Sequence, residues 1–133
     1  MVDSFGVDSH PDGLLEAEVS EVSSLAELGS LRTVLATVAG GQPRDGAAFT
    51  VAELADIFER PDGGNARDQD AFRHFLGLAA DAAYQPTLLL EPTSTGWWML
   101  DGIHRAAALF SARRVAGRAE LRLPVFVLPR PLV

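Results

Sequence analysis

The sequence predicts an α+β fold, a small mixed sheet with helices packed on it. Three amphipathic helical patterns lie in the first two-thirds of the chain, and the order strand, strand, helix, strand follows at the C-terminal end. With 133 residues, of which 47% are hydrophobic, the chain can bury about two-thirds of its unfolded surface. It has no cysteine, so the core must hold without disulfides. We expect a single domain over residues 14–133 after a flexible polar tail over residues 1–13.

The charge pattern restricts the partners. The formal net charge is −7, whereas a protein that binds DNA or RNA nonspecifically usually carries a basic face that displaces counterions from the phosphates. A local basic patch suits a small anionic ligand better than a duplex, and it contains Arg105, Arg113, Arg114, Arg118 and Arg122. DNA binding is therefore not expected.

Neither a membrane segment nor an export signal is visible. No stretch reaches 18 apolar residues, and the N-terminus MVDSFGVDSH lacks the basic start and apolar run of a signal peptide. We expect a cytoplasmic protein with no membrane contact. Its alanine, arginine and glycine content fits a GC-rich bacterial genome. The sequence leaves the oligomeric state open, a homodimer included.

The first strand is expected over residues 14–22. Leu15, Ala17 and Val19 alternate with polar residues, which is the period of a half-buried strand. We expect these three side chains to share the face that is turned to the core.

A helix is expected next. Ser24 and Glu27 have the spacing of a capping box. Apolar residues then recur at helical intervals as far as Gly40, namely Leu25, Leu28, Leu31, Leu35 and Val38. A strand over Thr33–Val38 is the alternative interpretation of the same stretch.

Two further helices follow. Thr50 and Glu53 repeat the capping-box spacing before a short amphipathic helix that Pro61 ends. The letters PDGGN then indicate a turn or an exposed loop. A longer helix is expected from about Asp68 to Ala83, because its aromatic and leucine side chains repeat on one face.

The C-terminal part carries the clearest patterns. The letters TLLLE, PTSTG and WWML predict a hairpin of two short strands. A helix over residues 103–115, ended by Gly117, comes next, and the apolar run LRLPVFVL predicts the last strand.

One segment, LDGIHRAAAL at residues 100–109, joins a strand end, a glycine turn and a helix start to charged side chains. The first N–H groups of a helix carry partial positive charge and Arg105 adds a permanently charged donor, so phosphate is the expected ligand. Gly102 lets a ligand approach the backbone. Asp101 can accept a proton or hold a magnesium ion, and His104 can donate to a phosphate oxygen or transfer a proton. The alternative is that Asp101 caps the helix and pairs with Arg105.

The segment resembles the DGxHRxxA signature of the ParB/sulfiredoxin superfamily, in which this turn binds nucleotide phosphates. QPTLLLE at residues 85–91 resembles the family's QP-plus-strand segment, and LPVFVL at residues 123–128 resembles its closing strand. The resemblance covers residues 84–129 and implies the superfamily's fold. A weaker similarity, QPRDGAAFTVAELA at residues 42–55, implies that Arg44 approaches the same pocket.

The resemblance also implies a function. Superfamily members similar to the free-serine kinases transfer a phosphoryl group to a small hydroxyl compound. We therefore expect a nucleotide-binding enzyme, an ATP-dependent phosphotransferase or a nucleotide hydrolase, that uses ATP or another nucleoside triphosphate with Mg²⁺. Gly102, Ile103 and His104 would present donors, Arg105 would neutralise phosphate, and Asp101 would act as base or metal ligand. The alternatives are a noncatalytic, nucleotide-gated regulatory module or a ParB-like module that binds DNA or a partner, and a degenerate member that serves as a scaffold.

Departures from the family pattern narrow this expectation. In sulfiredoxins the residue before the motif histidine is the catalytic cysteine, and here it is Ile103, so sulfinic-acid reduction is excluded. Chromosome-partition ParB proteins carry a helix-turn-helix domain after this module, which we do not expect because the sequence ends at Val133. The candidates for the family's N-terminal catalytic glutamate are Glu16, Glu18 and Glu21, and the sequence does not say which of them, if any, points inward.

Several other residues have simpler interpretations. His10, His74 and His104 lack the spacing of zinc ligands. Trp97 and Trp98 are neighbours on an expected strand and face opposite sides. Contact with the core or a partner is the favoured interpretation for both, and stacking of one on a nucleotide base or substrate ring is the alternative. A solvated, dipole-stabilised helix end is expected for Arg113, Arg114 and Arg118.

Overall fold

The computed structural model describes residues 18–43, 48–94 and 96–129, which form a five-stranded sheet and four helices. The elements are β1 (Glu18–Ser24), α2 (Leu25–Ser30), β2 (Arg32–Thr33), α3 (Val51–Phe58), α4 (Ala66–Ala79), β3 (Leu89–Thr93), β4 (Gly96–Asp101), α5 (Ile103–Val115) and β5 (Glu120–Val127). The α+β class is confirmed, as is the C-terminal order of strand, strand, helix and strand. The expected tail over residues 1–13 lies outside the described residues.

The sheet is mixed, as expected. Its strands lie in the order β1-β5-β3-β4-β2. β1 is antiparallel to β5 and β3 is antiparallel to β4, whereas β5 runs parallel to β3 and β4 runs parallel to β2. The last strand in sequence is therefore inserted between the first strand and the hairpin.

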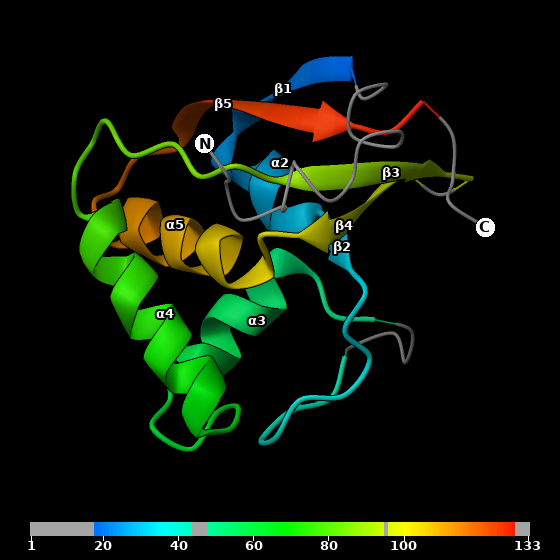
Figure 1. Ribbon diagram of the computed structural model, residues 1–133. Coiled ribbons are helices and arrows are strands. Elements are labelled where there is room, and N and C mark those ends of the chain that lie inside the picture. Colours follow the sequence, from blue (N-terminus) through cyan, green and yellow to red (C-terminus); the bar gives the residue numbers. More distant parts are fainter. Residues whose placement is uncertain (1–17, 44–47, 95, 130–133) are drawn as a thin grey trace.

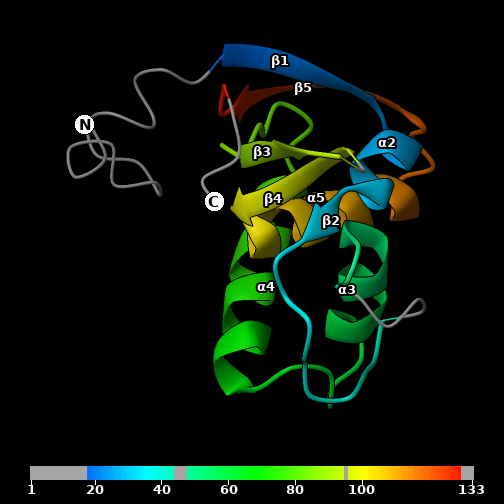
Figure 2. The same ribbon diagram turned by 90° about the vertical axis from the view of Figure 1, so that its right-hand side faces the viewer.

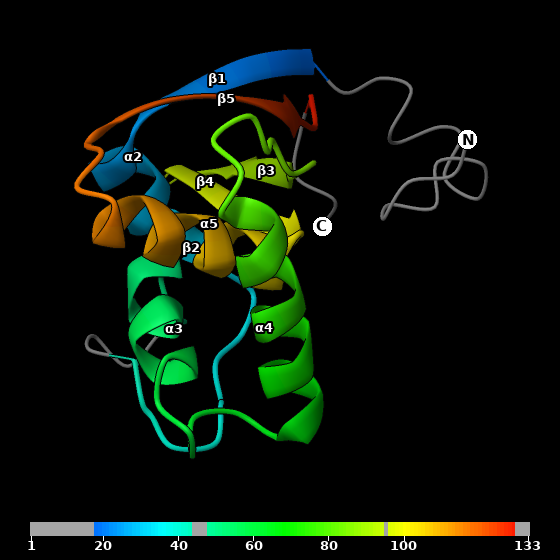
Figure 3. The ribbon, with the colours of Figure 1, turned by 90° about the vertical axis from the view of Figure 1, so that its left-hand side faces the viewer.

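Helices α3, α4 and α5 lie on one face of the sheet (Figure 1). α5 lies next to the strands, and α3 and α4 pack on the side of α5 that is turned away from them (Figure 3). Buried residues run almost the whole length of α5: Ala106, Ala107, Ala108, Leu109, Phe110, Ser111 and Arg113. Short alanine side chains let both layers approach this helix, which holds its N-terminus firmly at the end of β4.

A long connection runs from β2 down to the turn that joins α3 to α4 (Figure 2). The N–H of Gly64 donates to the carbonyl oxygen of Ala39 at 2.7 Å, and the Arg60 side chain donates to the carbonyl oxygen of Gly40. None of the helices in the described ranges combines the length and the apolar composition needed to cross a bilayer.

The faces of β1 differ from the expectation. Val22 is fully buried and lies opposite Leu123 of β5, while Val19 is 67% exposed and lies opposite Phe126. Because alternate residues of a strand share a face, the expectation that Val19 faces the core is wrong. Leu15 and Ala17, which were expected on the same face, lie outside the described residues.

The helix expected as far as Gly40 is only the six-residue α2. The Ser24 hydroxyl accepts from the N–H of Glu27 at 3.0 Å, as expected. The Glu27 carboxylate accepts from the N–H of Ser23, at 2.9 Å, instead of that of Ser24. The apolar spacing continues beyond Ser30, but the helix does not.

A two-residue strand, β2, begins just after α2, within the stretch where the helix was expected to continue. β2 pairs with β4, and both the N–H and the hydroxyl of the buried Thr33 donate to the carbonyl oxygen of Phe49 at 2.8 Å. The alternative of a strand at this place is therefore correct in kind, but the strand covers Arg32–Thr33 instead of Thr33–Val38.

The later helices agree better with expectation. In α3, the Thr50 hydroxyl accepts from the N–H of Glu53 at 3.2 Å, and the Glu53 carboxylate accepts from the N–H of Thr50 at 2.8 Å. α4 begins before the expected start because Asn65 and Asp68 form a second capping box. The box begins at Asn65, the last residue of the PDGGN segment, which was expected only as a turn or loop.

The expectation for Arg113 is wrong. Its side chain is only 7% exposed, and its guanidinium donates to the carbonyl oxygens of Ala79 at 3.1 Å and Ala82 at 3.0 Å. Arg114 and Arg118 are exposed, as expected. Arg114 pairs with two carboxylates of α3 and its terminal loop, those of Asp56 at 2.8 Å and Glu59 at 2.9 Å.

Candidate functional site

The DGIHR turn joins β4 to α5 through Gly102, whose φ of 91° lies in the left-handed region. A Cβ atom at this position would lie 2.6 Å from Cδ2 of Leu88 and 2.9 Å from the carbonyl oxygen of Thr87. The fold itself therefore requires glycine here, for its backbone conformation and for its close packing on the segment that leads into β3. Approach of a ligand is not needed to explain this glycine.

A cleft of about 270 Å³ opens beside the turn. Residues 100–105 line it together with Leu35, which follows β2, and Phe75 of α4. The cleft thus brings together three of the expected site residues, Asp101, His104 and Arg105, with an apolar wall. Its position at the end of β4 and the start of α5 is the one the sequence predicts.

The N-terminus of α5 has no side-chain cap. The first N–H groups of a helix find no acceptor within the helix and concentrate partial positive charge at this end. Asp101 does not cap the helix, and among the described residues neither Arg105 nor any other group forms an ion pair or side-chain hydrogen bond with it. The structural alternative for Asp101, cap and partner of Arg105, is therefore wrong.

Arg105 is held beside the cleft by two contacts. Its Nη1 donates to the carbonyl oxygen of Thr87 at 3.4 Å, and its guanidinium carbon lies 5.2 Å from the centre of the Phe75 ring. These contacts orient the guanidinium and leave most of its five N–H donors for an anion. Burial raises the pKa of the nearby Tyr84 hydroxyl, and the positive charge of Arg105 opposes that rise.

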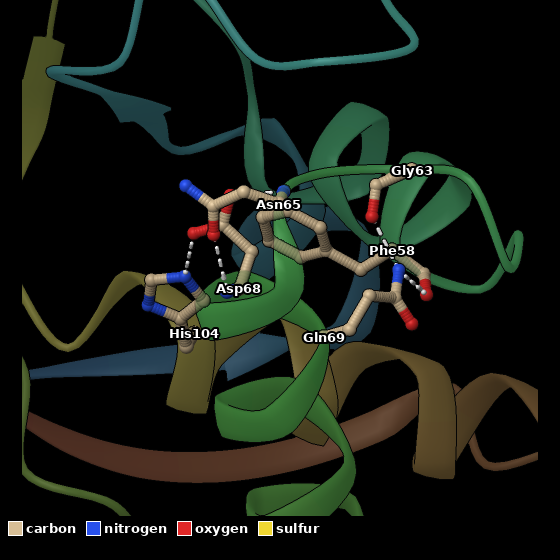
Figure 4. Close-up of polar contacts among 6 residues, drawn as sticks. All are labelled: Phe58, Gly63, Asn65, Asp68, Gln69 and His104. Atoms are coloured by element: carbon tan, nitrogen blue, oxygen red, sulfur yellow. Dashed lines mark hydrogen bonds and ion pairs between the residues drawn. The ribbon is translucent and has the colours of Figure 1, made fainter.

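His104 has a partner that the sequence did not predict. Its Nε2 lies 2.9 Å from Oδ1 of Asp68 in the first turn of α4, and its ring stacks on Phe58 with the ring centres 5.3 Å apart and the planes 18° from parallel (Figure 4). The spacing of Asn65 and Asp68 could have revealed the capping box. No local pattern links Asp68 to a histidine 36 residues away.

The same part of α4 organises the turn before it. The side-chain amide of the buried Gln69 donates to the carbonyl oxygens of Phe58 and Gly63 (Figure 4). It also donates to the carbonyl oxygen of Arg60, at 2.9 Å. This amide binds the end of α3 and the loop to α4, which holds Phe58 and Asp68 in place around the His104 ring.

Of the expected N-terminal glutamates, the two that lie within the described residues do not reach the cleft. Asp101 of β4 pairs with Leu89 of β3, Leu89 pairs with Phe126 of β5, and Phe126 pairs with Val19 of β1. β1 therefore lies three strand spacings, or about 14 Å, from the strand that carries Asp101. Glu18 and Glu21 lie exposed on β1. Glu16 and Arg44 lie outside the described residues.

The other singled-out residues lie away from the cleft. His74 is exposed and meets the Phe75 ring edge to face, with ring centres 5.1 Å apart. Trp97 packs against the core, Trp98 is half-buried, and neither lines the cleft. His10 lies outside the described ranges. Within the described ranges no group of three or more histidine, aspartate or glutamate side chains could hold a metal ion.

Comparison of this chain with protein-family models, curated proteins and solved structures finds no match in any of the three.

Proposed function

We propose that the protein is a ParB/sulfiredoxin-like enzyme that binds a nucleoside triphosphate, most simply ATP, at the start of α5 and transfers a phosphoryl group to a small metabolite. The observation that carries this proposal is the uncapped N-terminus of a 13-residue helix that opens into a cleft between Asp101 and Arg105. An anion placed there meets free N–H groups, the helix dipole and a guanidinium together.

Each residue of the turn has a role in this proposal. The N–H groups at Ile103 and His104 donate to phosphate oxygens, and Arg105 neutralises the charge that develops during transfer. Apolar contacts with Phe75 and Leu35 exclude water from one side of the cleft. Gly102 contributes by setting the direction of the helix and not by contact.

A magnesium ion fits Asp101. Mg²⁺ commonly takes one or two protein carboxylates and completes its shell with phosphate oxygens and water, so a single carboxylate beside a phosphate site is sufficient. The ion would supply charge neutralisation between the phosphates. ATP and Mg²⁺ both occur in the cytoplasm, which is where we place this activity.

Calorimetric titration with MgATP, MgADP, MgCTP and MgGTP tests the proposal. We expect one nucleotide to bind at micromolar concentration. Arg105→Gln, which removes the charge but keeps a polar, shorter side chain, should weaken binding at least tenfold, the equivalent of about 1.4 kcal/mol. Arg73→Gln is the matched control, because Arg73 is exposed on α4 and does not line the cleft. Absence of binding by all four nucleotides would refute the proposal.

Turnover separates the enzyme from a regulatory module. Release of nucleoside diphosphate in the presence of a pool of small hydroxyl compounds supports phosphoryl transfer, and release without an acceptor indicates a hydrolase. Binding without turnover by either route supports the noncatalytic, nucleotide-gated module, in which the ligand changes contact with a partner.

A further inference from the structure

Asp68 uses its two carboxylate oxygens for different partners. Oδ2 accepts from the N–H of Asn65 at 3.1 Å, and Oδ1 lies 2.9 Å from Nε2 of His104. The side chains of Asp68 and His104 are 22% and 31% exposed, so the contact is partly shielded from water. Asp68 and His104 belong to different elements, α4 and α5, and both positions are set by helix starts.

This contact determines where the histidine proton lies. An ionised carboxylate only accepts hydrogen bonds, so Nε2 must carry the hydrogen and Nδ1 of the neutral ring must carry the lone pair. Phe58 covers one face of the ring and limits its rotation. Figure 4 shows Nδ1 turned away from Asp68, and His104 is one of the residues that line the cleft.

We infer that Asp68 is a positioning residue that presents Nδ1 of His104 to the cleft as the proton acceptor for the hydroxyl group that attacks the nucleotide. This inference rests on the proposed function. It adds a residue outside the DGIHR turn and assigns His104 the role of base, which leaves Asp101 for the metal.

The proton and electron pairs balance in this step. The acceptor's O–H bond breaks as its proton moves to Nδ1, and the freed electron pair on oxygen forms the new bond to the γ-phosphorus. The bond from that phosphorus to the bridging oxygen breaks, and its electron pair leaves on the nucleoside diphosphate. The Asp68 carboxylate stabilises the imidazolium until the proton returns to solvent.

Asp68→Asn is the decisive variant because the hydrogen bond from the N–H of Asn65 determines which way the new side-chain amide is turned. The N–H of Asn65 still requires an acceptor, so the new amide oxygen takes the place of Oδ2 and the NH₂ group faces His104. An NH₂ group donates, so Nε2 must now accept and the hydrogen moves to Nδ1. Asn65→Gly is the matched control, since it removes the Asn65 side chain at a cost of a few tenths of a kcal/mol and leaves the Asp68–His104 contact intact.

Two measurements on the whole chain report the tautomer of His104 and the reactivity of its lone pair. Two-bond proton–nitrogen NMR spectra distinguish the tautomers of its three histidines, with His74→Gln and His104→Gln used for assignment. Diethyl pyrocarbonate acylates an imidazole lone pair, and peptide mass spectrometry gives its rate at His104 relative to the exposed His74. We expect the Nε2–H form and rapid acylation in the parent and in Asn65→Gly. In Asp68→Asn we expect the Nδ1–H form and acylation slower by about tenfold.

Other outcomes overturn the inference. A tautomer at His104 that does not respond to Asp68→Asn, or an unchanged acylation rate, shows that Asp68 does not position a base. If calorimetry finds a nucleotide, saturating amounts of it must protect His104 from acylation, and failure to protect places Nδ1 outside the cleft. If no nucleotide binds, the proposed function fails, while the tautomer and the acylation rates still show whether Asp68 positions His104.

Discussion

The guanidinium of Arg113 completes the C-terminal end of α4 by donating to the carbonyl oxygen of Ala79 at 3.1 Å. A second donor of the same side chain reaches Ala82 at 3.0 Å. The last carbonyl groups of a helix have no partner within the helix, and here a buried arginine from α5 provides one. This contact joins α4, which carries Asp68 and Phe75, to the helix that carries the DGIHR turn.

Arg113→Ala should therefore unfold more easily than the parent, by about 3 kcal/mol, because it leaves the Ala79 carbonyl unsatisfied in a buried place and removes the part-buried contact with Ala82. Chemical denaturation measures this difference. Arg114→Ala is the comparison, since its ion pairs with Asp56 and Glu59 are more than one-third exposed and should contribute at most about 1 kcal/mol. Equal losses in the two variants would contradict the capping role of Arg113.

Gly102→Ala should destabilise the fold by about 2–5 kcal/mol, since it adds the cost of a left-handed backbone to a clash with Leu88 and Thr87. Gly77→Ala is the matched control. Gly77 lies inside α4 with open space around it, so alanine there should stabilise the protein by about 0.5–1 kcal/mol. Thermal melts of both variants test the pair, and a neutral Gly102→Ala would show that the turn is looser than described.

Gln69 should be intolerant of an acidic replacement. Gln69→Leu removes one donor from three carbonyl groups and should cost about 1–3 kcal/mol. Gln69→Glu keeps the shape but turns a carboxylate toward the same carbonyl oxygens, so it should cost more than leucine at neutral pH. Denaturant midpoints at pH 7 rank the two variants. The reverse ranking would show that shape matters more than the donor.

The pKa of Tyr84 depends on the charge of Arg105, and it can be measured by absorbance. Burial raises the pKa of this tyrosine, the only one in the chain, above its ordinary value of 10.0, and the Arg105 charge lowers it. Arg105→Gln should therefore raise the pKa further, and the ultraviolet absorbance of tyrosinate follows the titration. Since the folded pKa is the higher one, this group's contribution to stability is complete below about pH 10 and is lost as the pH rises through the folded value. Arg118→Gln should leave the titration unchanged.

Local patterns predicted the parts of the fold that local interactions determine. The hairpin, α5 and β5 follow from turn residues and apolar periods that lie within a few residues of one another, and so the DGIHR turn was placed correctly. The stretch after Ser30 was not, because its leucine spacing suits a helix while the hydrogen bonds from Thr33 to Phe49 and the pairing with β4 select a strand. Tertiary pairing overrides local propensity at this point.

Some residues of the candidate site could be predicted from the local sequence, and others could not. Asp101, Gly102 and Arg105 could be placed beside one cleft from a single segment of sequence. The contact between His104 and Asp68 could not, because the two residues meet only when α4 packs on α5. The prediction for Arg113 was wrong for the same reason. Arginine at a helix end is usually solvated, but here its acceptors are the last residue of α4 and a residue just after that helix.

The insertion of β5 between β1 and β3 has a consequence for biosynthesis. Until residues 120–127 emerge from the ribosome, β1 has no neighbour in the sheet and the β3 side of the hairpin is an open edge. Unpaired strand edges bind other chains readily. The nascent sheet therefore stays in two pieces until β5 is made, and closure of that gap by β5 is the step at which chaperones would matter most.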